Sequence, residues 1–287
     1  MSSDAAPRKA AVLGRPVAHS LSPVLHDAAF RALGLTGWTY ERIETGAEEL
    51  PALVDGLGPE WAGLSVTMPG KRAALDHATE VTDRAAAVGA ANTLVRVPGG
   101  WLADCTDVDG VTGALRIGGG YTPSPGDRAV VLGAGGTAAA AVVGLAALGI
   151  TAVSLVVREP ARARETLGAA ERAGLDVDVR RWSEADFPAL AARTAVLVST
   201  VPPEAVLPHV PALAAVPCVL DVIYHPWPTP LAEAVAARGG RLATGLDMLL
   251  HQAFGQSEHF TGRPAPRAEM RDALRAATGG LVPLRLA

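Results

Sequence analysis

The stretch Arg128–Ala138, RAVVLGAGGTA, carries the pattern that decides the fold of this chain. Its first five residues form a short apolar run typical of a buried strand, and Ala-rich sequence that favours a helix follows. The turn between them fits G-x-G-x-x-A, in which the first glycine allows a tight turn, the second lets the backbone approach a pyrophosphate, and the helix N-terminus supplies amide donors. A tight turn without a ligand is the alternative. We predict a Rossmann-type, doubly wound α/β domain whose dinucleotide-binding loop contains Gly133, Gly135, Gly136 and Thr137.

Strand-like and helical stretches alternate along the whole chain, which is the pattern of an α/β protein. In the second half, apolar strands are predicted at Arg128–Leu132, Val153–Val157, Ala195–Ser199 and Cys218–Asp221. Helical stretches lie between these strands, as a doubly wound parallel sheet requires.

The first half of the chain predicts a separate α/β domain. Its strands are expected at Lys9–Gly14, Trp38–Ile43, Trp61–Thr67, Asn92–Val97 and Trp101–Ala103. Helices are expected at Pro23–Leu33, with Ser22 as its N-cap, and at Glu48–Leu57 and Thr82–Val88. Two further helices are expected near the end of the chain, at Gly245–Phe260 and Arg267–Ala277. The last two strands flank Pro98-Gly99-Gly100, which reads as a hairpin and therefore predicts a mixed sheet.

The composition limits the classes of protein to which the chain can belong. With 287 residues it is long enough for two domains, and a formal net charge of −4 offers no basic surface for nucleic acid. Its two cysteines lie far apart in sequence, which indicates a reducing compartment and predicts a cytoplasmic protein. The chain shows no cluster of His, Cys and carboxylates with the spacing of metal ligands, so we expect no metal. We expect His19, His26, His225 and His251 to be structural.

One stretch has to be weighed as a membrane span, because no residue between Arg128 and Arg158 is charged. The stretch is longer than the roughly 20 residues that a transmembrane helix needs. It contains five glycines, however, and splits into two β-branched runs around an Ala-rich middle. A buried strand–helix–strand unit has the same pattern, so we predict that unit and no membrane span.

The residues after the strand Val153–Val157 bear on the choice of cofactor. A site for NAD usually places an acid there to bind the ribose 2′-hydroxyl, whereas this chain has Arg158, with Arg162 close behind. A guanidinium suits a 2′-phosphate, through paired hydrogen bonds and stacking on the adenine. Glu159 would suit NAD and keeps that alternative open, as does a simple cluster of exposed charges. We predict NADP, bound partly through Arg158 and Arg162.

Polar residues gather near the ends of strands in the first 110 residues, where α/β folds collect ligands. Ser20 and Ser22 lie two apart on the turn after the first strand and would both hydrogen-bond a carboxylate or a polyol; a capping role for Ser22 is the alternative. Thr67, Asn92 and Asp107 follow near later strands. These residues interrupt Ala/Val-rich sequence, so they indicate a polar pocket.

Lys71 is conspicuous because the chain has only one other lysine, Lys9, among 25 basic residues. Lysine can give up a proton in a site, whereas arginine cannot. A lysine near an aspartate is most often a surface salt bridge. In a pocket beside a nicotinamide, Lys71 would instead donate a proton to a substrate carbonyl oxygen, and Asp107 would position and charge-balance it.

In these residues the chain resembles the shikimate dehydrogenase family, over nearly its whole length. Six motifs occur in the family's order: Gly14–Pro23 (GRPVAHSLSP), Ser65–Lys71 (SVTMPGK), Ala91–Leu94 (ANTL), Asp104–Asp107 (DCTD), the nucleotide loop with Arg158, and Gly245–Ala253 (GLDMLLHQA). The chain departs from the family at Ser65 and Cys105, where the family often has Asn, and at Val157-Arg158-Glu159, where it has Asn-Arg-Thr.

The resemblance implies roles for individual residues. It implies that Lys71 and Asp107 are the catalytic pair and that Ser20 and Ser22 bind the substrate carboxylate. It assigns the remaining substrate contacts to Thr67, Asn92, Asp107, Gln252 and Tyr224, and the positions near the cofactor to Gly245, Met248, Arg158 and Arg162.

The resemblance also implies an activity: reversible reduction of 3-dehydroshikimate to shikimate by NADPH, in chorismate and aromatic amino acid biosynthesis. Residues 1–110, completed by 246–287, would bind the substrate, and 111–245 would bind NADP. The protein would be a monomer or a homodimer. Alternatives are an NAD-preferring quinate/shikimate dehydrogenase, an aminoshikimate-pathway paralogue and, least favoured, a non-catalytic nucleotide-binding sensor.

Overall fold

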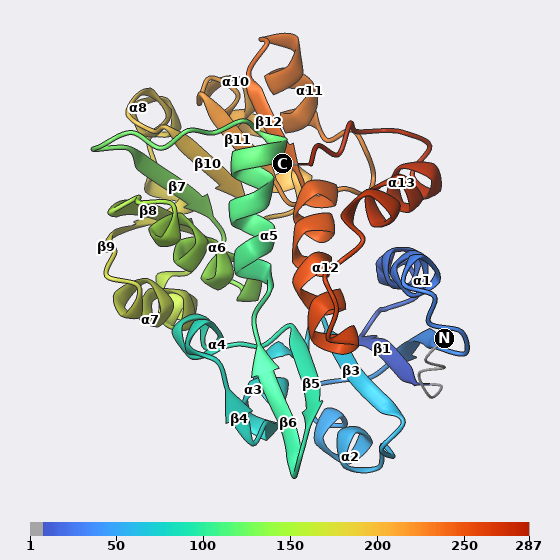
Figure 1. The fold of residues 1–287 in the computed structure, drawn as a ribbon. Helices are drawn as coiled ribbons and strands as arrows, with labels where there is room; N and C mark the ends of the chain where they lie inside the picture. The colour runs from blue at the N-terminus through green and yellow to red at the C-terminus, as the bar shows by residue number, and fades with distance from the viewer. Residues whose placement is uncertain (1–7, 287) are drawn as a thin grey trace. The chain divides into compact units, whose positions relative to one another are not determined.

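The computed structural model of the protein describes residues 8–286. This part of the chain divides into two compact units (Figure 1). The first combines residues 8–106 with residues 252–286, and the second is made of residues 107–251. The first unit therefore draws on both ends of the chain and the second on its middle.

The first unit contains a mixed sheet in the order β2-β1-β3-β5-β6-β4. Its strands are β1 (Lys9–Gly14), β2 (Thr39–Glu44), β3 (Trp61–Val66), β4 (Glu80–Val81), β5 (Thr93–Val97) and β6 (Gly100–Asp104). β1 runs parallel to both of its neighbours, whereas β5 is antiparallel to β3 and forms a hairpin with β6. The predicted mixed sheet and hairpin are confirmed.

Helices cover both faces of this sheet because β1 is apolar on both sides. On one face Leu13 lies in a cluster with Leu50, and on the other Val12 lies in a cluster with Phe30 and Phe260. The helices that supply residues to this unit are α1 (Ser22–Ala32), α2 (Leu50–Asp55), α3 (Lys71–His77), α4 (Asp83–Val88), α12 (Gly245–Thr261, from residue 252 on) and α13 (Arg267–Ala277).

The second unit contains a wholly parallel sheet in the order β12-β11-β10-β7-β8-β9. Its strands are β7 (Arg128–Leu132), β8 (Ala152–Val157), β9 (Asp176–Arg181), β10 (Val196–Ser199), β11 (Cys218–Asp221) and β12 (Arg241–Thr244). The chain starts at the centre with β7, builds outward to β9, and then returns to the other side of β7. This is the Rossmann order, and its switch point beside β7 is where such sheets bind ligands.

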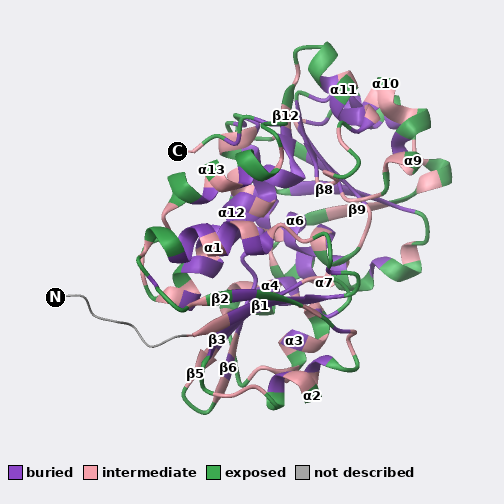
Figure 2. Ribbon diagram, turned by 90° about the vertical axis from the view of Figure 1, so that its right-hand side faces the viewer, coloured by how far each residue is buried: buried purple, intermediate pink, exposed green. Residues whose placement is uncertain are grey.

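Helices enclose the parallel sheet on both faces. α8 (Phe187–Ala192), α9 (Pro203–Val206), α10 (Val210–Leu213) and α11 (Pro230–Ala237) share one apolar cluster with the strands. The other face is covered by α6 (Gly136–Ala147), which contacts β7. α6 also contacts α5 (Asp107–Gly113) and α7 (Arg164–Arg172). Figure 2 shows the result: buried residues follow the strands, and exposed residues lie on the outer helices. Short helical turns at Ala114–Gly118, Pro160–Ala163, Trp182–Glu184 and Leu207–His209 complete the unit.

The structure corrects several expectations from the sequence. Ser22 does not cap α1: it is the first helical residue, the N-cap is Leu21, and that end of the helix has no side-chain cap. Leu21 has φ −90° and ψ 2°, so the backbone already turns there and lacks the extended geometry that a capping serine uses. α2 is shorter than predicted, at both ends.

Three strands were missed: β4, β9 and β12. β9 reads DVDVRR and lies at the edge of its sheet, where polar side chains face water and the apolar signal is weak. β12 is also an edge strand, and β4 has two residues. In residues 8–286 no helix is both long enough and apolar enough to cross a membrane, and the uncharged stretch forms β7, α6 and β8, as predicted.

Candidate active site

The glycine-rich loop after β7 has the backbone geometry that the sequence predicted. Gly133 has φ +101°, and a Cβ there would lie 2.4 Å from Thr200 Oγ1, so a side chain would be both strained and blocked. A Cβ on Gly135, in contrast, would meet nothing within 4 Å. α6 begins at Gly136 and carries no acidic residue in its first turn. The loop thus exposes backbone amides to open space at a helix N-terminus, which fits a pyrophosphate.

The segment after β8 places its charges unequally. Arg158 and Arg162 are exposed, and within residues 8–286 no carboxylate lies within ion-pair distance of either. Glu159 is also exposed, but Arg181 Nη2 of β9 lies 3.6 Å from its carboxylate. The acid that kept NAD open is therefore engaged by an arginine, and Arg181 adds a third guanidinium to this tip that the sequence reasoning did not single out.

The start of α12 is closely packed within the second unit. A Cβ on Gly245 would lie 2.1 Å from the carbonyl oxygen of Val222 and 2.9 Å from Cδ1 of Tyr224, so only glycine fits. Thr244 and Asp247 form a capping box: Thr244 Oγ1 accepts the amide of Asp247 at 3.2 Å, and Asp247 Oδ2 accepts the amide of Thr244 at 2.9 Å. Gly245 and Tyr224 are thus brought together, and their predicted roles beside the cofactor and the substrate stay predictions. Met248, in the same helical turn as Gly245, is buried. The burial of the Tyr224 side chain raises the pKa of its phenol.

The two serines after β1 lie side by side in the first unit. Ser20 Oγ accepts the amide of Ser22 at 3.2 Å, and the guanidinium of Arg42 donates to Ser20 O at 2.6 and 3.0 Å. Tyr40 lies close to Ser22, and its hydroxyl donates to Ser65 Oγ at 2.6 Å. Burial raises the pKa of Tyr40 well above its ordinary value, so the phenol keeps its proton.

Asn92 and Gln252 meet inside the first unit although 160 positions separate them. Asn92 Nδ2 donates to Gln252 Oε1 at 3.2 Å and to Thr106 Oγ1 at 3.0 Å. Asn92 Oδ1 in turn accepts the amide of Thr106 and the hydroxyl of Thr93, each at 2.8 Å. Two predicted substrate residues therefore share one buried hydrogen-bond network.

Thr67 and Lys71 are placed by the turn that joins β3 to α3. The Thr67 amide donates to Leu13 O at 2.8 Å, and α3 begins at Lys71, whose carbonyl accepts the amide of Ala91 at 2.9 Å. Asp107 begins α5 and is only 6% exposed. Lys71 belongs to the first unit and Asp107 is the first residue of the second, so their pairing stays a prediction.

Comparison with known proteins decides the family. Residues 12–94 match the Shikimate dehydrogenase substrate binding domain, and residues 245–275 match the Shikimate 5'-dehydrogenase C-terminal domain. The shikimate dehydrogenase (NADP(+)) of Methylobacterium radiotolerans is 40% identical, over 95% of this chain and 98% of that protein. The chain belongs to the shikimate dehydrogenase family.

Solved structures of family members and relatives agree with this assignment. The crystal structure of the Mycobacterium tuberculosis shikimate dehydrogenase has a TM-score of 0.88 and 55% identity, over 94% of this chain and 100% of the other. The quinate dehydrogenase of Corynebacterium glutamicum, in complex with NAD, has a TM-score of 0.83 and 26% identity, over 94% of this chain and 99% of the other. The predicted family and fold class are confirmed.

One charged cluster in this family member escaped the sequence reasoning. Asp104, the first residue of the DCTD motif, is 1% exposed and accepts hydrogen bonds from Thr82 at 2.7 Å and from Arg84 Nε at 2.6 Å, and its other oxygen lies 2.6 Å from His259 Nε2. Burial disfavours its charge, but the bonds from Arg84, His259 and Thr82 outweigh burial and hold the pKa of Asp104 well below its ordinary value. The cluster ties β6 and α4 to α12.

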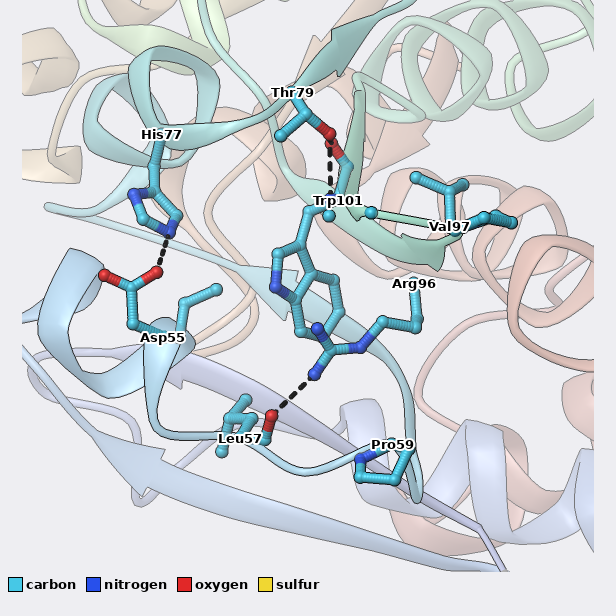
Figure 3. Close-up of a pocket in the computed structure, with 12 residues that line it drawn as sticks. Asp55, Leu57, Pro59, His77, Thr79, Arg96, Val97 and Trp101 are labelled. Atoms are coloured by element: carbon cyan, nitrogen blue, oxygen red, sulfur yellow. Dashed lines mark hydrogen bonds and ion pairs between the residues drawn. The ribbon is translucent and has the colours of Figure 1, made fainter.

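A further pocket of about 810 Å³ opens in the first unit between the end of α2 and the β5–β6 hairpin (Figure 3). Its polar groups largely bind one another. Arg96 lies over the Trp101 ring at 3.9 Å and donates to Leu57 O at 2.8 Å, and His77 Nε2 lies 3.0 Å from the Asp55 carboxylate. None of the predicted shikimate dehydrogenase residues lines this pocket, and we assign it no chemistry.

Proposed function

We propose that this protein catalyses the reversible, NADP-dependent reduction of 3-dehydroshikimate to shikimate, as a step of chorismate and aromatic amino acid biosynthesis. The observation that carries the proposal is similarity along nearly the whole chain to shikimate dehydrogenases, among them the M. tuberculosis enzyme at 55% identity. The buried cluster of Asn92 and Gln252 gives this similarity a chemical basis, since paired amides suit a substrate with several hydroxyls.

The proton chemistry is assigned to Lys71 and Asp107. Bound NADPH supplies a hydride to the ring ketone, so the carbonyl oxygen needs one proton to become the alcohol. Lys71 would donate that proton from its ammonium group, and Asp107 would position Lys71 and balance its charge. In the reverse direction the neutral amine would take the proton of the hydroxyl. Lysine is rare in this arginine-rich chain, and the presence of one at position 71 supports this role.

The remaining predicted residues would bind the substrate. The hydroxyls of Ser20 and Ser22 would donate hydrogen bonds to the substrate carboxylate. The two residues lie next to each other, which supports their binding the same carboxylate. Thr67, Asn92 and Gln252 would bind the ring hydroxyls, and Tyr224 would add a contact from the second unit. Residues 8–106 with residues 252–286 would thus form the substrate-binding domain, and the Rossmann unit the NADP-binding domain.

The choice of NADP rests on the arginines after β8. Arg158 and Arg162 are exposed and would pair with a 2′-phosphate, while Arg181 engages Glu159. The open loop around Gly135 and the helix N-terminus of α6 would hold the pyrophosphate. The relative from M. radiotolerans is itself named for NADP(+).

The rival function is quinate oxidation with NAD, favoured by Glu159 and by the similarity to the C. glutamicum quinate dehydrogenase. Quinate carries an extra hydroxyl on the carboxylate-bearing carbon, so the region of Ser20 and Ser22 would discriminate. Steady-state rates for shikimate and quinate, each with NADP and with NAD, test both functions. We expect kcat/KM to be highest for shikimate with NADP; no turnover of either substrate would contradict the proposal, and a preference for quinate with NAD would establish the rival.

The oligomeric state and the compartment stay predictions. We expect a monomer or a homodimer, and light scattering coupled to size-exclusion chromatography would distinguish them. Cell fractionation would test the predicted cytoplasmic location.

A further inference from the structure

A set of buried polar side chains lies under the proposed substrate residues and has no role in the chemistry above. Gln256 of α12 is at its centre and is 1% exposed; Ser65 of β3 is 4% exposed, Tyr40 of β2 7%, and His26 of α1 0%. Ser65 is also the position where the family often has Asn. α1 and β3 therefore meet α12 at one carboxamide, and β2 reaches it through Ser65.

The orientation of the Gln256 amide is fixed by its partners. Its Nε2 lies 3.0 Å from the carbonyl oxygen of Asn92, which can only accept a hydrogen bond, so the amino group must face Asn92. The same Nε2 donates to Thr93 Oγ1 at 3.0 Å. Gln256 Oε1 must then accept from the other side, where Ser65 Oγ lies 2.7 Å away. The carboxamide thus has one allowed orientation.

This orientation fixes the protons on the side of the proposed carboxylate contacts. Because Ser65 gives its proton to Gln256, Ser65 must accept the proton of Tyr40, which lies close to Ser22. His26 Nε2 faces Gln256 Oε1 at 3.4 Å and must carry a hydrogen, so the ring is the Nε2–H tautomer. Burial lowers the pKa of His26 to about 4, and the neutral ring stacks on Tyr40 at 4.4 Å.

The same orientation fixes the amides on the side of the ring hydroxyls. Since Thr93 accepts from Gln256, it gives its own proton to Asn92 Oδ1, which also accepts the amide of Thr106. Asn92 must therefore turn its Nδ2 to Gln252 Oε1. Gln252 is thereby fixed with its Oε1 toward Asn92 and its amino group at the opposite end of the carboxamide.

We propose that Gln256 is a positioning residue for the dehydrogenase reaction: its carboxamide sets, through Ser65 and Tyr40 on one side and Thr93 and Asn92 on the other, which hydrogen-bonding groups face the substrate. Gln256 is not a catalytic residue, because it acts through its neighbours. The proposal rests on the proposed function, since it assumes that Ser22, Asn92 and Gln252 bind the substrate.

The first test is Gln256→Met, which keeps the length of the side chain and removes both ends of its hydrogen bonding. We expect KM for shikimate to rise about tenfold or more, because buried partners lose their bonds, while KM for NADP and kcat at saturation change little. Ser257→Ala is the matched control: Ser257 is buried on the same helix, and its hydroxyl has no hydrogen-bond partner within residues 8–286. A wild-type KM for shikimate in Gln256→Met, or equal rises for both ligands, would overturn the proposal.

The second test separates positioning from packing by its dependence on pH. In Gln256→Glu a protonated carboxyl still offers one donor and one acceptor, whereas a carboxylate offers no donor. Burial should raise the pKa of that carboxyl toward or above neutrality. We expect the variant-to-wild-type ratio of KM for shikimate to rise about tenfold from pH 6 to pH 9. His26 and Tyr40, the titratable groups that face this site from α1 and β2, have pKa values of about 4 and well above 10, outside that range.

A ratio independent of pH would count against the assigned orientation. If either Gln256 variant fails to fold, Tyr40→Phe provides a milder test, since it removes only the hydroxyl that donates to Ser65. We expect its KM for shikimate to rise about threefold, and an unchanged value would overturn the proposal. Wild-type turnover of shikimate tests the proposed function separately, so the two can fail independently.

Discussion

The two units are built to present different groups to a ligand. In the parallel sheet, β7, β8, β10 and β11 are buried and almost wholly apolar, and most of the groups predicted to bind the cofactor are backbone amides around Gly133 and Gly135. In the mixed sheet, β3 and β5 carry buried hydroxyls, and the groups predicted to bind the substrate are side chains. Backbone amides need only a turn to aim them, whereas side chains need partners beneath them. The difference explains why the first unit contains the larger buried polar network.

The largest expected effect removes a side chain from the first unit. Lys71→Ala should lower kcat by roughly two to four orders of magnitude if Lys71 is the proton donor, with shikimate still bound. Lys71→Arg should be similarly impaired, because arginine keeps its proton. Lys9→Ala is the control, since Lys9 is an exposed lysine near Glu41. Stopped-flow and steady-state assays measure the effect. A wild-type kcat in Lys71→Ala would show that Lys71 is not the proton donor.

The next effect concerns a side chain that supports the first unit. Asp104→Asn should destabilise the protein by about 3 kcal/mol at pH 7, because it breaks a buried charge network. The pKa of Asp104 is lowered in the folded state, so its contribution is full above the ordinary value of 3.8 and is lost as pH falls toward the folded-state pKa. The cost of the substitution should therefore shrink below pH 4.

Urea unfolding of wild type and variant at pH 7 and at pH 3.5 measures this difference. Asp76→Asn, which breaks an exposed pair with Arg72, should cost little at either pH. An equal cost of Asp104→Asn at both pH values would show that the charge of Asp104 does not stabilise the fold.

A smaller effect is expected when the backbone conformation of the glycine-rich loop in the second unit is disturbed. Gly133→Ala should destabilise the protein by about 2 kcal/mol and raise KM for NADPH, because its Cβ would clash with Thr200 at a left-handed position. Gly174→Ala has a similar positive φ but open space around it, so it should show the conformational cost alone. Thermal unfolding and cofactor titration distinguish clash from conformation; equal effects of the two would contradict the close approach.

The smallest expected effect concerns Arg158, which is an exception in the second unit because it would bind the cofactor through its side chain and not through its backbone. Arg158→Ala should raise KM for NADPH about tenfold and leave KM for NADH almost unchanged, since only NADPH carries the 2′-phosphate. Arg172→Ala, on α7, is a control arginine outside the tip. Equal effects on the two cofactors would point away from recognition of the phosphate.

Much of the fold could be predicted from the sequence, for identifiable reasons. β1, β7 and β11 have the predicted bounds because each is a short apolar run ended by glycine or a polar residue. β9 and β12 escaped because edge strands carry polar residues. The predicted cap at Ser22 was wrong because a serine followed by proline suits both a cap and a first turn.

The site divides in the same way. Residues in ordered motifs, such as Asn92 and Gln252, could be proposed from the sequence, and the structure brings these two together. The network around Gln256 could not, because Gln256 and Ser65 are 191 positions apart and nothing in the sequence pairs them. One signal was available: Gln252 and Gln256 lie four apart and so share a helix face, with Met248 and Phe260 four residues to either side.

That shared face has an evolutionary consequence. An asparagine at position 65 would carry its own donor and acceptor into the space that Ser65, Tyr40 and Gln256 now share, so it would not fit beside the glutamine without competing for the same bonds. Relatives with asparagine at position 65 should therefore lack the glutamine four residues after Gln252, and those with serine should keep both it and the tyrosine. The three positions should change together across the family, as a single inherited unit.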